Sequence, residues 1–442
     1  MNSPGHVGDL LLSNSGIWMY RFIEELYPIC RSITGEGTRE TLRRIALHVP
    51  IEIHEVPSGT KAFDWTVPKE WNVRDAYVRN KAGDRVIDFR KSNLHLLNYS
   101  IPFRGKVSLE TLREHLFTLP GQSELIPYRT SYYKENWGFC VSQCLAEALQ
   151  EPEYDVCIDA DLKDGSLTYG ECFVPGNTDQ EVLFSCHICH PSLCNDNLSG
   201  IALTTWLARY LQKKNSRFSY RFLFVPGTIG AIVWLSRNED LVSKIRHGLV
   251  VACVGDPGKP TYKKSRRGDA EIDRAVLHVL RTSGSQFTVR EFTPYGYDER
   301  QYCSPGFDLP VGSLTRTPHG EYPEYHTSAD NLGLVRSESL SDSLSLYLEV
   351  IDILESNSTY MNLYPKCEPQ LGKRGLYRIL GGDPNAGERE MALLWILNMS
   401  DGKHSLLDIG ERSGLTVGCL REMADLLMEH GLLAKSDLVR AR

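Results

Sequence analysis

The densest group of potential metal ligands lies between residues 186 and 200. It contains His187, His190 and Asp196, together with three cysteines. The apolar run 182–186 opens this segment and a helical pattern follows it, which predicts a strand that ends shortly before a helix begins. Open α/β sheets bind ligands at the carboxyl ends of their strands. Because imidazole and carboxylate groups suit Zn²⁺, we interpret the segment as a candidate zinc site.

The same segment has three other interpretations. Residues 195–197 also match a helix-capping turn. Cys186, Cys189 and His190 have the spacing of a c-type haem attachment site, which requires an exported chain and an exposed loop. A redox pair or zinc thiolates would use the two cysteines, but the chain has no second cysteine pair at matching spacing. We interpret both cysteines as residues of a buried strand.

Two further candidate ligands come later in the chain. His326 lies just before Ser328 and Asp330, which are residue types that cap helices. Asp256 follows the apolar run 249–254. Taken alone, His326 is typical of a structural histidine and Asp256 of a turn residue. Their expected position at the same sheet edge as the first group favours a shared metal site.

The composition bounds the class of protein. With 442 residues, of which 41% are hydrophobic and 24% charged, the chain is expected to be globular, with two or three domains. Its net charge of −7 disfavours nucleic acid as a main partner, because phosphate binding needs clustered basic residues. No signal-like or membrane-spanning run is present. We therefore expect a cytoplasmic protein with no membrane partner and mostly reduced cysteines.

The elements that must position the candidate ligands form an α/β pattern. Continuous apolar runs at 182–186, 222–225 and 249–254 alternate with helical patterns. Strands that are apolar throughout are buried on both faces, which predicts a parallel or mixed sheet with helices on both faces. A helix predicted over 337–355 completes this core.

Two other regions differ from the α/β core in texture. Residues 65–171 contain short alternating runs separated by Gly, Asn and Pro, which predicts a mostly β insertion. After a linker at 357–370, three helical patterns occupy 388–431. The sequence between the second and third has the helix, tight turn, helix pattern of a winged helix or helix-turn-helix.

Four segments carry a resemblance to a known family: 27–37, 63–71, 189–191 and 321–331. They are similar to aminopeptidase-like proteins of polysaccharide and natural-product biosynthesis loci, which are related to co-catalytic zinc aminopeptidases. The resemblance covers nearly the whole chain. It implies a zinc-aminopeptidase-like α/β fold with a mixed sheet, helices on both faces, an inserted mostly β domain and a C-terminal winged helix. The implied domains are 1–64 with 172–365 (catalytic, discontinuous), 65–171 (insertion) and 370–442 (winged-helix-like).

The resemblance also implies a ligand set. In the zinc aminopeptidase pattern, a His after one strand and an Asp before the Ser-Gly helix bind metal, and a third-strand Asp and a late His complete the site. Carried over residue by residue, these are His190, Asp196, Asp256 and His326, with His187 as an alternative to His190. The implied cofactor is zinc.

The chain departs from the family pattern at Gly227. Zinc aminopeptidases carry two glutamates here, a general base and a metal ligand, and the aminopeptidase-like family resembles Pro-Glu-Thr-Ile-Gly. This chain has Gly227 and Thr228, so it lacks both carboxylates. The loss of the ligand favours one metal ion over two. The loss of the base removes a contribution of about 10²- to 10⁴-fold in rate.

Other residues of the late loops are candidates for the base and for substrate binding. Asp298, Glu299, Glu321 and Glu324 are carboxylates that should overhang the site, and each also has an interpretation as a loop or substrate-orienting residue. Arg316 could hold a carboxylate in a bidentate pair. We expect Tyr325, Glu321 and Arg316 to contact the substrate, and Asp298 and Glu324 to be the main catalytic candidates.

Two functions follow from these residues. The first is a zinc-dependent amide hydrolase that acts on a small aminoacylated or peptide-like substrate in a biosynthetic pathway. The alternative is a catalytically impaired binding or regulatory protein that retains the fold and the metal site. Residues 373–442 contain ten basic and ten acidic side chains, which is a poor composition for binding phosphates. We therefore expect protein contact or homo-oligomerisation, and not DNA binding, from the C-terminal domain.

Overall fold

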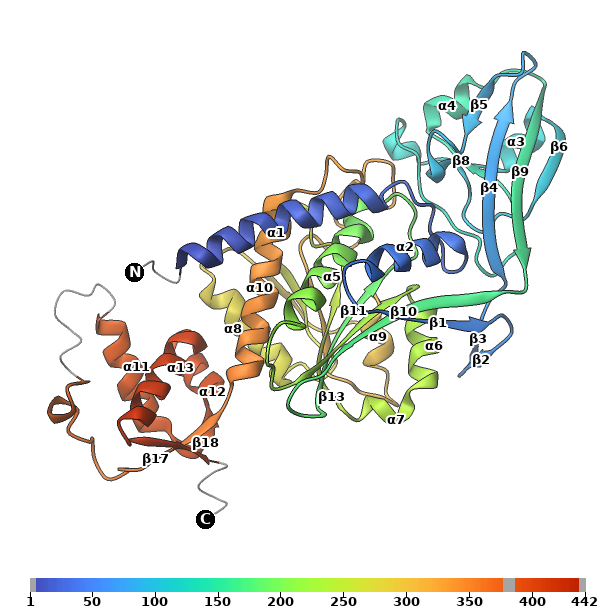
Figure 1. Ribbon diagram of the computed structural model, residues 1–442. Helices are drawn as coiled ribbons and strands as arrows, with labels where there is room; N and C mark the ends of the chain where they lie inside the picture. The colour runs from blue at the N-terminus through green and yellow to red at the C-terminus, as the bar shows by residue number, and fades with distance from the viewer. Residues whose placement is uncertain (1–4, 377–385, 437–442) are drawn as a thin grey trace. The chain divides into compact units, whose positions relative to one another are not determined.

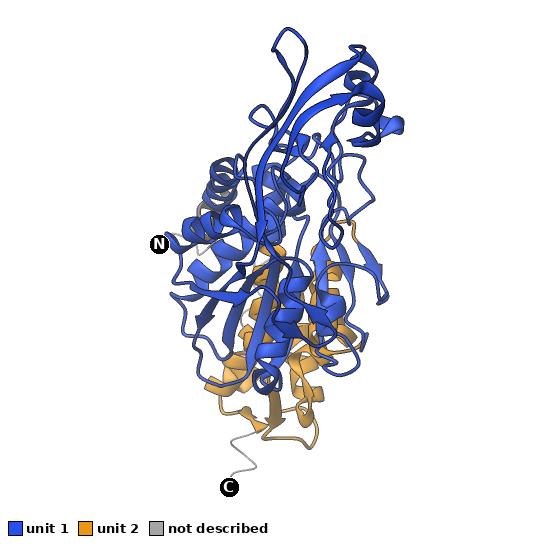
Figure 2. Cartoon of the chain, turned by 90° about the vertical axis from the view of Figure 1, so that its right-hand side faces the viewer, with its two compact units in different colours: residues 1–268, 288–344 blue, residues 269–287, 345–442 orange. Residues whose placement is uncertain are grey.

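The computed structural model describes residues 5–376 and 386–436. The chain divides into two compact units, which Figure 2 shows in blue and orange. The first comprises residues 1–268 and 288–344, and the second comprises residues 269–287 and 345–442. Among the described residues, no helix is both long and apolar enough to cross a membrane.

An eight-stranded mixed sheet forms the centre of the first unit (Figure 1). Its spatial order is β1-β10-β12-β11-β13-β16-β14-β15. The strands are β1 (Glu52–Pro57), β10 (Ser166–Val174), β12 (Ser219–Val225), β11 (Glu181–His187), β13 (Ile245–Val251), β16 (Val311–Thr315), β14 (Thr261–Lys263) and β15 (Thr288–Arg290). The four central strands, β12, β11, β13 and β16, are parallel. The pairs β1–β10, β10–β12 and β14–β16 are antiparallel, and β14 and β15 are parallel.

Helices cover this sheet on both faces. The crossover from β11 through α5 to β12 and the crossover from β12 through α6 to β13 run in opposite directions. Since such crossovers are right-handed, α5 and α6 lie on opposite faces, as Figure 1 shows. The helices of this unit are α1 (Gly5–Leu26), α2 (Glu36–Ala46), α5 (Gly200–Leu211), α6 (Ile229–Arg237), α7 (Glu239–Val242), α9 (Glu299–Tyr302) and the beginning of α10 (Ser337–Ser356), which continues into the second unit after residue 344.

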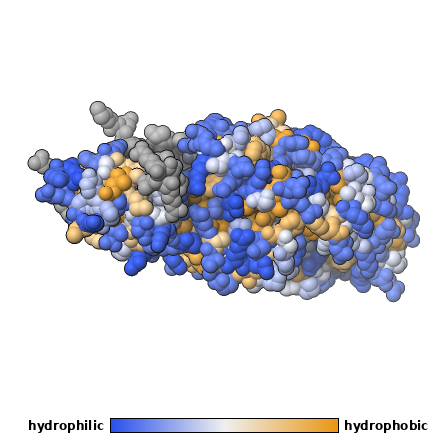
Figure 3. Space-filling view, turned by 90° about the horizontal axis from the view of Figure 1, so that it is seen from below, coloured by the Kyte–Doolittle hydropathy of each residue, from blue (hydrophilic) through white to orange (hydrophobic). Residues whose placement is uncertain are grey.

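The burial of the central strands explains their apolar sequences. Every residue of β11 and of β12 is buried, and so is all of β16. A strand that is covered on both faces buries the side chains of both faces. Its sequence is therefore apolar throughout and does not alternate between apolar and polar residues. By contrast, the surface seen in Figure 3 is largely hydrophilic, with hydrophobic residues scattered over it.

A four-stranded antiparallel sheet with order β5-β4-β9-β6 follows β1 in the chain. Its strands are β5 (Arg85–Asp88), β4 (Glu70–Arg79), β9 (Glu153–Lys163) and β6 (Phe103–Ser108). Smaller elements accompany it: β2 (Lys61–Ala62), β3 (Trp65–Thr66), α3 (Leu109–Glu114), β7 (Leu116–Phe117), β8 (Phe139–Cys140) and α4 (Gln143–Ala148). This is the additional β sheet that the alternating pattern of 65–171 predicts. β10, which begins at Ser166, belongs instead to the eight-stranded sheet.

The second unit contains a winged helix. Its three-stranded sheet has the order β18-β17-β19, with β17 (Thr359–Asn362), β18 (Asp401–Ser405) and β19 (Leu433–Lys435). Its helices are α8 (Glu271–Thr282), α11 (Ala386–Met399), α12 (Leu406–Ser413) and α13 (Val417–Glu429). α12 starts at a capping box between Ser405 and Asp408, and Gly414 ends it in the left-handed conformation with φ 76°.

The predicted architecture is confirmed: a mixed α/β sheet with helices on both faces, an additional antiparallel sheet and a C-terminal winged helix. The predicted domain boundaries stay predictions. Two observations bear on where such boundaries would fall. β17 pairs with β18 and β19 although it precedes residue 370. α8 belongs to the second unit although it lies between β14 and β15 in the chain.

Candidate metal centre

Three histidines surround the carboxylate of Asp196 at the carboxyl edge of the central sheet. His187 Nε2 lies 2.7 Å from Asp196 Oδ1, and His326 Nε2 lies 3.0 Å from Asp196 Oδ2. His190 Nδ1 lies 3.5 Å from Asp196 Oδ2. Ligand atoms of His187, His190 and Asp196 all lie within 4.8 Å of one another. The structure therefore brings His190, Asp196, His326 and also His187 together.

Local structure positions each of these side chains. His187 is the last residue of β11, and Asp196 lies in a single irregular helical turn, Cys194–Ser199, that leads into α5. Asn197 fastens this turn to the sheet, since its Nδ2 donates to the Val251 carbonyl at 3.0 Å. His326 has φ 54°, a left-handed conformation that is uncommon outside glycine and recurs at functional sites.

The electrostatics of the cluster favour an ionised Asp196. Burial alone would raise the pKa of this carboxyl, but His190 and His187 hold its pKa well below the usual range. Burial lowers the pKa of His187, and the adjacent Asp196 carboxylate more than compensates, so that the pKa of His187 is raised. Burial lowers the pKa of His190 to about 3, which keeps its ring neutral.

The residues present fit a zinc ion. A neutral imidazole and an ionised carboxylate are the forms that bind the metal. Within the described part of the chain, the buried Nδ1 atom of His190 has no hydrogen-bond partner. A buried polar atom of this kind calls for an explanation, and a metal ion between His187, His190, His326 and Asp196 would provide it.

Asp256 is not brought into this cluster. Its carboxylate accepts hydrogen bonds from Thr317 Oγ1 at 2.5 Å, Gly258 N at 2.7 Å, Asn195 Nδ2 at 3.1 Å and Thr317 N at 3.1 Å. These four donors occupy its lone pairs and make it a loop-fastening residue. Cys253, two residues beyond the end of β13, reaches the cluster instead, and its Sγ lies 3.9 Å from Asp196 Oδ1.

Gly227 and Asp298 face each other beside His187. A Cβ atom at position 227 would lie 3.6 Å from Asp298 Oδ1 and 3.0 Å from His187 Cβ. Asp298 is buried, and neither of its carboxylate oxygens has a hydrogen-bond partner among the described residues. Burial raises the pKa of Asp298 to about 7. A carboxylate therefore lies near the position of the missing glutamate, although it comes from another loop.

The other predicted site residues have varied surroundings. Tyr325 stacks on His326 with ring centroids 3.9 Å apart. Glu321 pairs with Arg290 near the surface, and Glu324 contributes its backbone carbonyl to a turn with Thr327. Arg316 is buried and donates to the Ser339 carbonyl at 3.3 Å, so its guanidinium fastens α10. Of these four residues, Tyr325 is the one whose side chain packs on a histidine of the cluster.

The sequence predicts that Cys186 and Cys189 are strand residues. Cys186 lies within β11, as predicted, whereas Cys189 lies two residues beyond the end of that strand. Both thiols are buried, and burial raises the pKa of Cys189 to about 12. No cysteine of the described residues forms a disulfide.

Several residues that fasten the cluster were not singled out by the sequence. Asp330 accepts from Asn195 N at 2.6 Å and Asp196 N at 3.0 Å, which ties the Asp196 turn to the His326 loop. Tyr128, from the chain between β7 and β8, presents its ring edge to His190 and His326 at centroid distances of 5.2 and 5.1 Å. Nothing in the spacing around Tyr128 could have indicated this role.

One buried arginine gives a physical meaning to the motif at 27–37. Arg31 is 1% exposed and donates to the carbonyls of His190 at 2.7 Å, Leu26 at 2.8 Å and Pro191 at 3.4 Å. Its guanidinium therefore holds the backbone of a cluster histidine. The signal available in the sequence was a charged residue inside the motif at 27–37.

This combination of a mixed α/β sheet and a His–Asp cluster at its carboxyl edge defines an aminopeptidase-like domain. A zinc aminopeptidase from Bacillus subtilis shares the fold, with a TM-score of 0.56 at 13% identity, over 77% of this chain and 94% of that one. The family described as a domain of unknown function, DUF4910, matches residues 20–357, and a winged helix-turn-helix family matches residues 358–435. The chain belongs to the DUF4910 family.

Two relatives from Clostridium acetobutylicum match nearly the whole chain. A protein described as "Putative polysaccharide biosynthesis protein with aminopeptidase-like domain" is 54% identical over 421 residues, which are 95% of this chain and 97% of the relative. A crystal structure described as a "putative peptidase" has a TM-score of 0.92 at 53% identity and covers 96% of this chain and 97% of that one. These comparisons confirm the predicted resemblance.

Proposed function

We propose that this protein is a zinc-dependent amide hydrolase that acts on a small aminoacylated or peptide-like substrate, with Asp298 as its general base. The observation that carries this proposal is the position of Asp298. Its buried, unpartnered carboxylate lies beside His187 and faces the position where related zinc enzymes place a glutamate. The aminopeptidase-like fold and the His–Asp cluster support the same reaction class.

The side chains would divide the chemistry as follows. A zinc ion held by His187, His190, His326 and Asp196 would supply Lewis acidity toward a carbonyl oxygen and toward water. Asp298 would accept the proton of the attacking water at Oδ1 and return it to the leaving amine nitrogen. Its raised pKa suits this task, because a base that works near neutral pH must also be able to release its proton there. The products are a carboxylate and an amine.

Metal content tests the ligand set directly. We expect purified protein to contain zinc by mass spectrometry of the metal, and we expect His187→Ala to lose most of it. Glu324→Gln is the matched control, because Glu324 is in the same region and its backbone carbonyl, rather than its carboxylate, accepts the hydrogen bond from Thr327. Metal retained in the histidine variant would contradict the assignment.

A carboxylate exchange tests the base. Asp298→Asn should abolish most hydrolysis of a panel of aminoacyl p-nitroanilides. Adding Gly227→Glu to that variant returns a carboxylate to the opposite side of the same space and should recover at least about tenfold of the lost rate. Gly227→Glu alone should gain little, because it places two carboxylates together beside His187. Failure of the double variant to recover, with zinc bound and folding intact, would reject Asp298 as the base.

Gly227 itself favours a second function. Without a glutamate there, the protein could bind an amide ligand at the metal centre and not cleave it. The two functions differ in one measurement: a binding protein would hold zinc and show no turnover with the whole substrate panel, whatever residue occupies position 298.

A further inference from the structure

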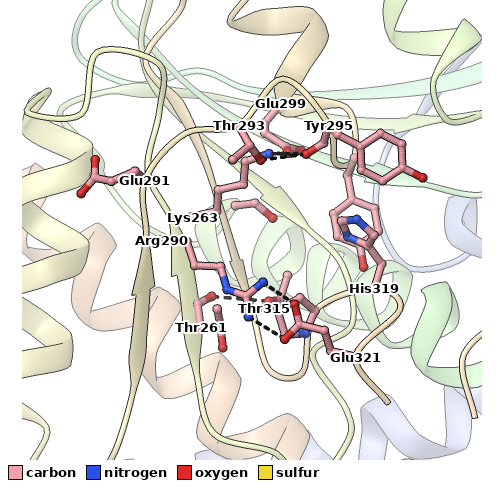
Figure 4. Close-up of a pocket in the computed structure, with 13 residues that line it drawn as sticks. Thr261, Lys263, Arg290, Glu291, Thr293, Tyr295, Glu299, Thr315, His319 and Glu321 are labelled. Atoms are coloured by element: carbon pink, nitrogen blue, oxygen red, sulfur yellow. Dashed lines mark hydrogen bonds and ion pairs between the residues drawn. The ribbon is translucent and has the colours of Figure 1, made fainter. Parts of the chain in front are cut away.

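A cavity lies beside the His–Asp cluster, over the edge of the eight-stranded sheet. It has a volume of about 250 Å³ and is lined by β14, β15 and β16 and by the loops that follow β15 and β16 (Figure 4). This is smaller than the roughly 300–1,000 Å³ typical of pockets for drug-sized ligands. The cavity therefore has room for one ring-sized group.

The charged side chains of this cavity neutralise one another. Lys263 Nζ lies 2.8 Å from Glu299 Oε1, and Arg290 makes a two-pronged ion pair with Glu321. Both pairs are visible in Figure 4. Glu291, at the rim, pairs with Lys264 at 2.7 Å. A charged ligand would thus find no uncompensated charge to bind and would have to disrupt an existing pair.

Three buried polar atoms of the cavity lack hydrogen-bond partners in the described structure. They are Glu299 Oε2, Ser313 Oγ and His319 Nδ1. Glu299 is 0% exposed and Ser313 is 3% exposed, so these groups have lost water without gaining a partner. Burial lowers the pKa of His319, which makes its neutral ring able to donate or to accept. The set offers one strict acceptor and two groups that accept or donate.

Aromatic rings connect the cavity to the metal centre. The ring of Tyr297 lies 4.7 Å from that of His319, and the ring of Tyr295 lies 5.6 Å from it. Tyr297 also stacks on His187 at 5.5 Å and places its hydroxyl 2.9 Å from Cys253 Sγ. Tyr297 therefore lines both the cavity and the His–Asp cluster. A ligand group bound in the cavity would lie next to an amide bond positioned at the cluster.

We propose that this cavity binds a neutral, polyhydroxylated ring, which is the chemistry of a sugar. Hydroxyl groups both donate and accept, so one ring can satisfy Glu299, Ser313 and His319 together, while its C–H face packs on an aromatic ring. A simple alkyl group would leave these polar atoms unpaired, and an ammonium group would meet a carboxylate that Lys263 already neutralises. If the protein is an amide hydrolase, as proposed above, a sugar in the cavity makes the substrate an amide of an amino sugar, and this step rests on that proposed function.

Binding of unreactive sugars tests the cavity without any catalysis. The probes are methyl glycosides of gluco, galacto and manno configuration, with glucosamine, glucuronic acid and cyclohexanol for comparison. We expect saturation-transfer NMR on the full-length protein to show binding of at least one neutral glycoside, with Kd below about 20 mM. We expect weaker signals from the charged sugars and from cyclohexanol.

Ser313→Ala is the decisive variant. The hydroxyl that it removes makes no hydrogen bond in the free protein, so the melting temperature should not fall, whereas Kd for the glycoside should rise about three- to tenfold. Ser400→Ala is the matched control, because Ser400 is a buried serine in the second unit whose hydroxyl is also unpartnered. It should leave Kd unchanged.

The outcomes separate the cavity from the hydrolase. Absence of glycoside binding, a preference for a charged probe, or the same Kd in Ser313→Ala would each overturn the sugar proposal. Glycoside binding that depends on Ser313 would support it even if no aminoacyl amide is cleaved, in which case the hydrolase proposal alone fails.

Discussion

Asp298 and Glu70 are both largely buried carboxylates of the first unit, and their surroundings differ. Glu70 accepts from Arg39 Nη1 at 2.8 Å and Nη2 at 2.6 Å, from Asn72 Nδ2 at 2.8 Å and from Ser166 N at 2.9 Å. Asp298 has no such donor among the described residues. The hydrogen bonds from Arg39 lower the pKa of Glu70 to about 2, whereas burial raises the pKa of Asp298 to about 7.

The difference is the one expected between a structural carboxylate and the general base that we propose. A buried carboxylate with four donors joins α2, β4 and the start of β10 and costs the fold little. A buried carboxylate without donors is unfavourable for folding, and such groups concentrate where a proton or a ligand is handled. Full hydrogen bonding thus indicates a stabilising role for Glu70, and the absence of hydrogen bonds supports the role that we propose for Asp298.

The largest expected effect is on activity. Asp298→Asn should lower kcat/KM for aminoacyl amides by about 10²- to 10⁴-fold, because it removes the proton acceptor. The unfolding free energy of the metal-free protein at pH 8 should stay the same or increase, since an unpaired charge is removed. Steady-state kinetics and urea unfolding check the two parts, and a less stable variant of full activity would reverse the assignment.

The next effect is on stability. Glu70→Gln should lower the unfolding free energy by about 2–3 kcal/mol, because charge-assisted hydrogen bonds from Arg39 are lost and an arginine is left without its partner. Amide hydrolysis per folded molecule should not change. Urea titration at pH 7 measures the loss, and Glu36→Gln is the control, because Glu36 pairs with Arg43 at an exposed position.

The pH dependence of stability should carry opposite signs for the two residues. Asp298 has a folded-state pKa above the usual 3.8, so its contribution is fully present below about pH 4 and is lost as the pH rises through about 7. Glu70 has a folded-state pKa below the usual 4.5, so its contribution is present above that pH and is lost as the pH falls toward 2.

Urea midpoints of the metal-free protein measured from pH 3 to pH 9 would show this contrast. We expect Asp298→Asn to reduce the change of the urea midpoint with pH between about pH 4 and pH 7, which we call the neutral limb. We expect Glu70→Gln to reduce this change below about pH 4.5, which we call the acidic limb. Asp330, whose pKa burial also raises to about 7, should leave part of the neutral limb in place. A variant that flattens the wrong limb would contradict the direction of the corresponding pKa shift.

The smallest expected effect extends the comparison to the second unit. Asp408 there is also well satisfied: it accepts from Ser405 N at 2.7 Å and forms an ion pair with Arg274 at 2.5 Å. Ser405→Ala removes the hydroxyl that caps α12 and should cost about 1 kcal/mol. Ser405→Asp, which retains a capping oxygen, should cost less, and an equal loss in both variants would argue against the cap.

The sequence located the cluster ligands that are close together in the chain. His187, His190 and Asp196 share one segment, and a strand followed by a helix needs only local patterns to be recognised. Asp256 was placed at the end of the apolar run, which extends to Val254, whereas β13 ends at Val251, and in the structure its carboxylate is held by Thr317, Gly258 and Asn195. The sequence pattern does not distinguish an apolar residue in a turn from one in a strand, and the end of β13 was therefore placed too late. The residue of this segment that contacts Asp196 is Cys253.

The position of Asp298 could be predicted only as a place in a late loop. The chain between β15 and α9 has no hydrophobic period, so nothing local indicates that Asp298 is buried beside Gly227. The cavity at Ser313 was beyond prediction for a related reason. Its walls come from three strands and two loops, and only their pairing in the sheet brings the three unpartnered atoms together.

The membership of α8 in the second unit bears on how this protein is made. α8 is synthesised between β14 and β15, yet its Arg274 pairs with Asp408 and Glu411 of α12. During synthesis, Arg274 therefore cannot form these ion pairs until nearly the whole chain has emerged from the ribosome. Translation proceeds at about 5–20 residues per second, so the wait lasts on the order of ten seconds. During that interval the guanidinium of Arg274 lacks both of its carboxylate partners on α12.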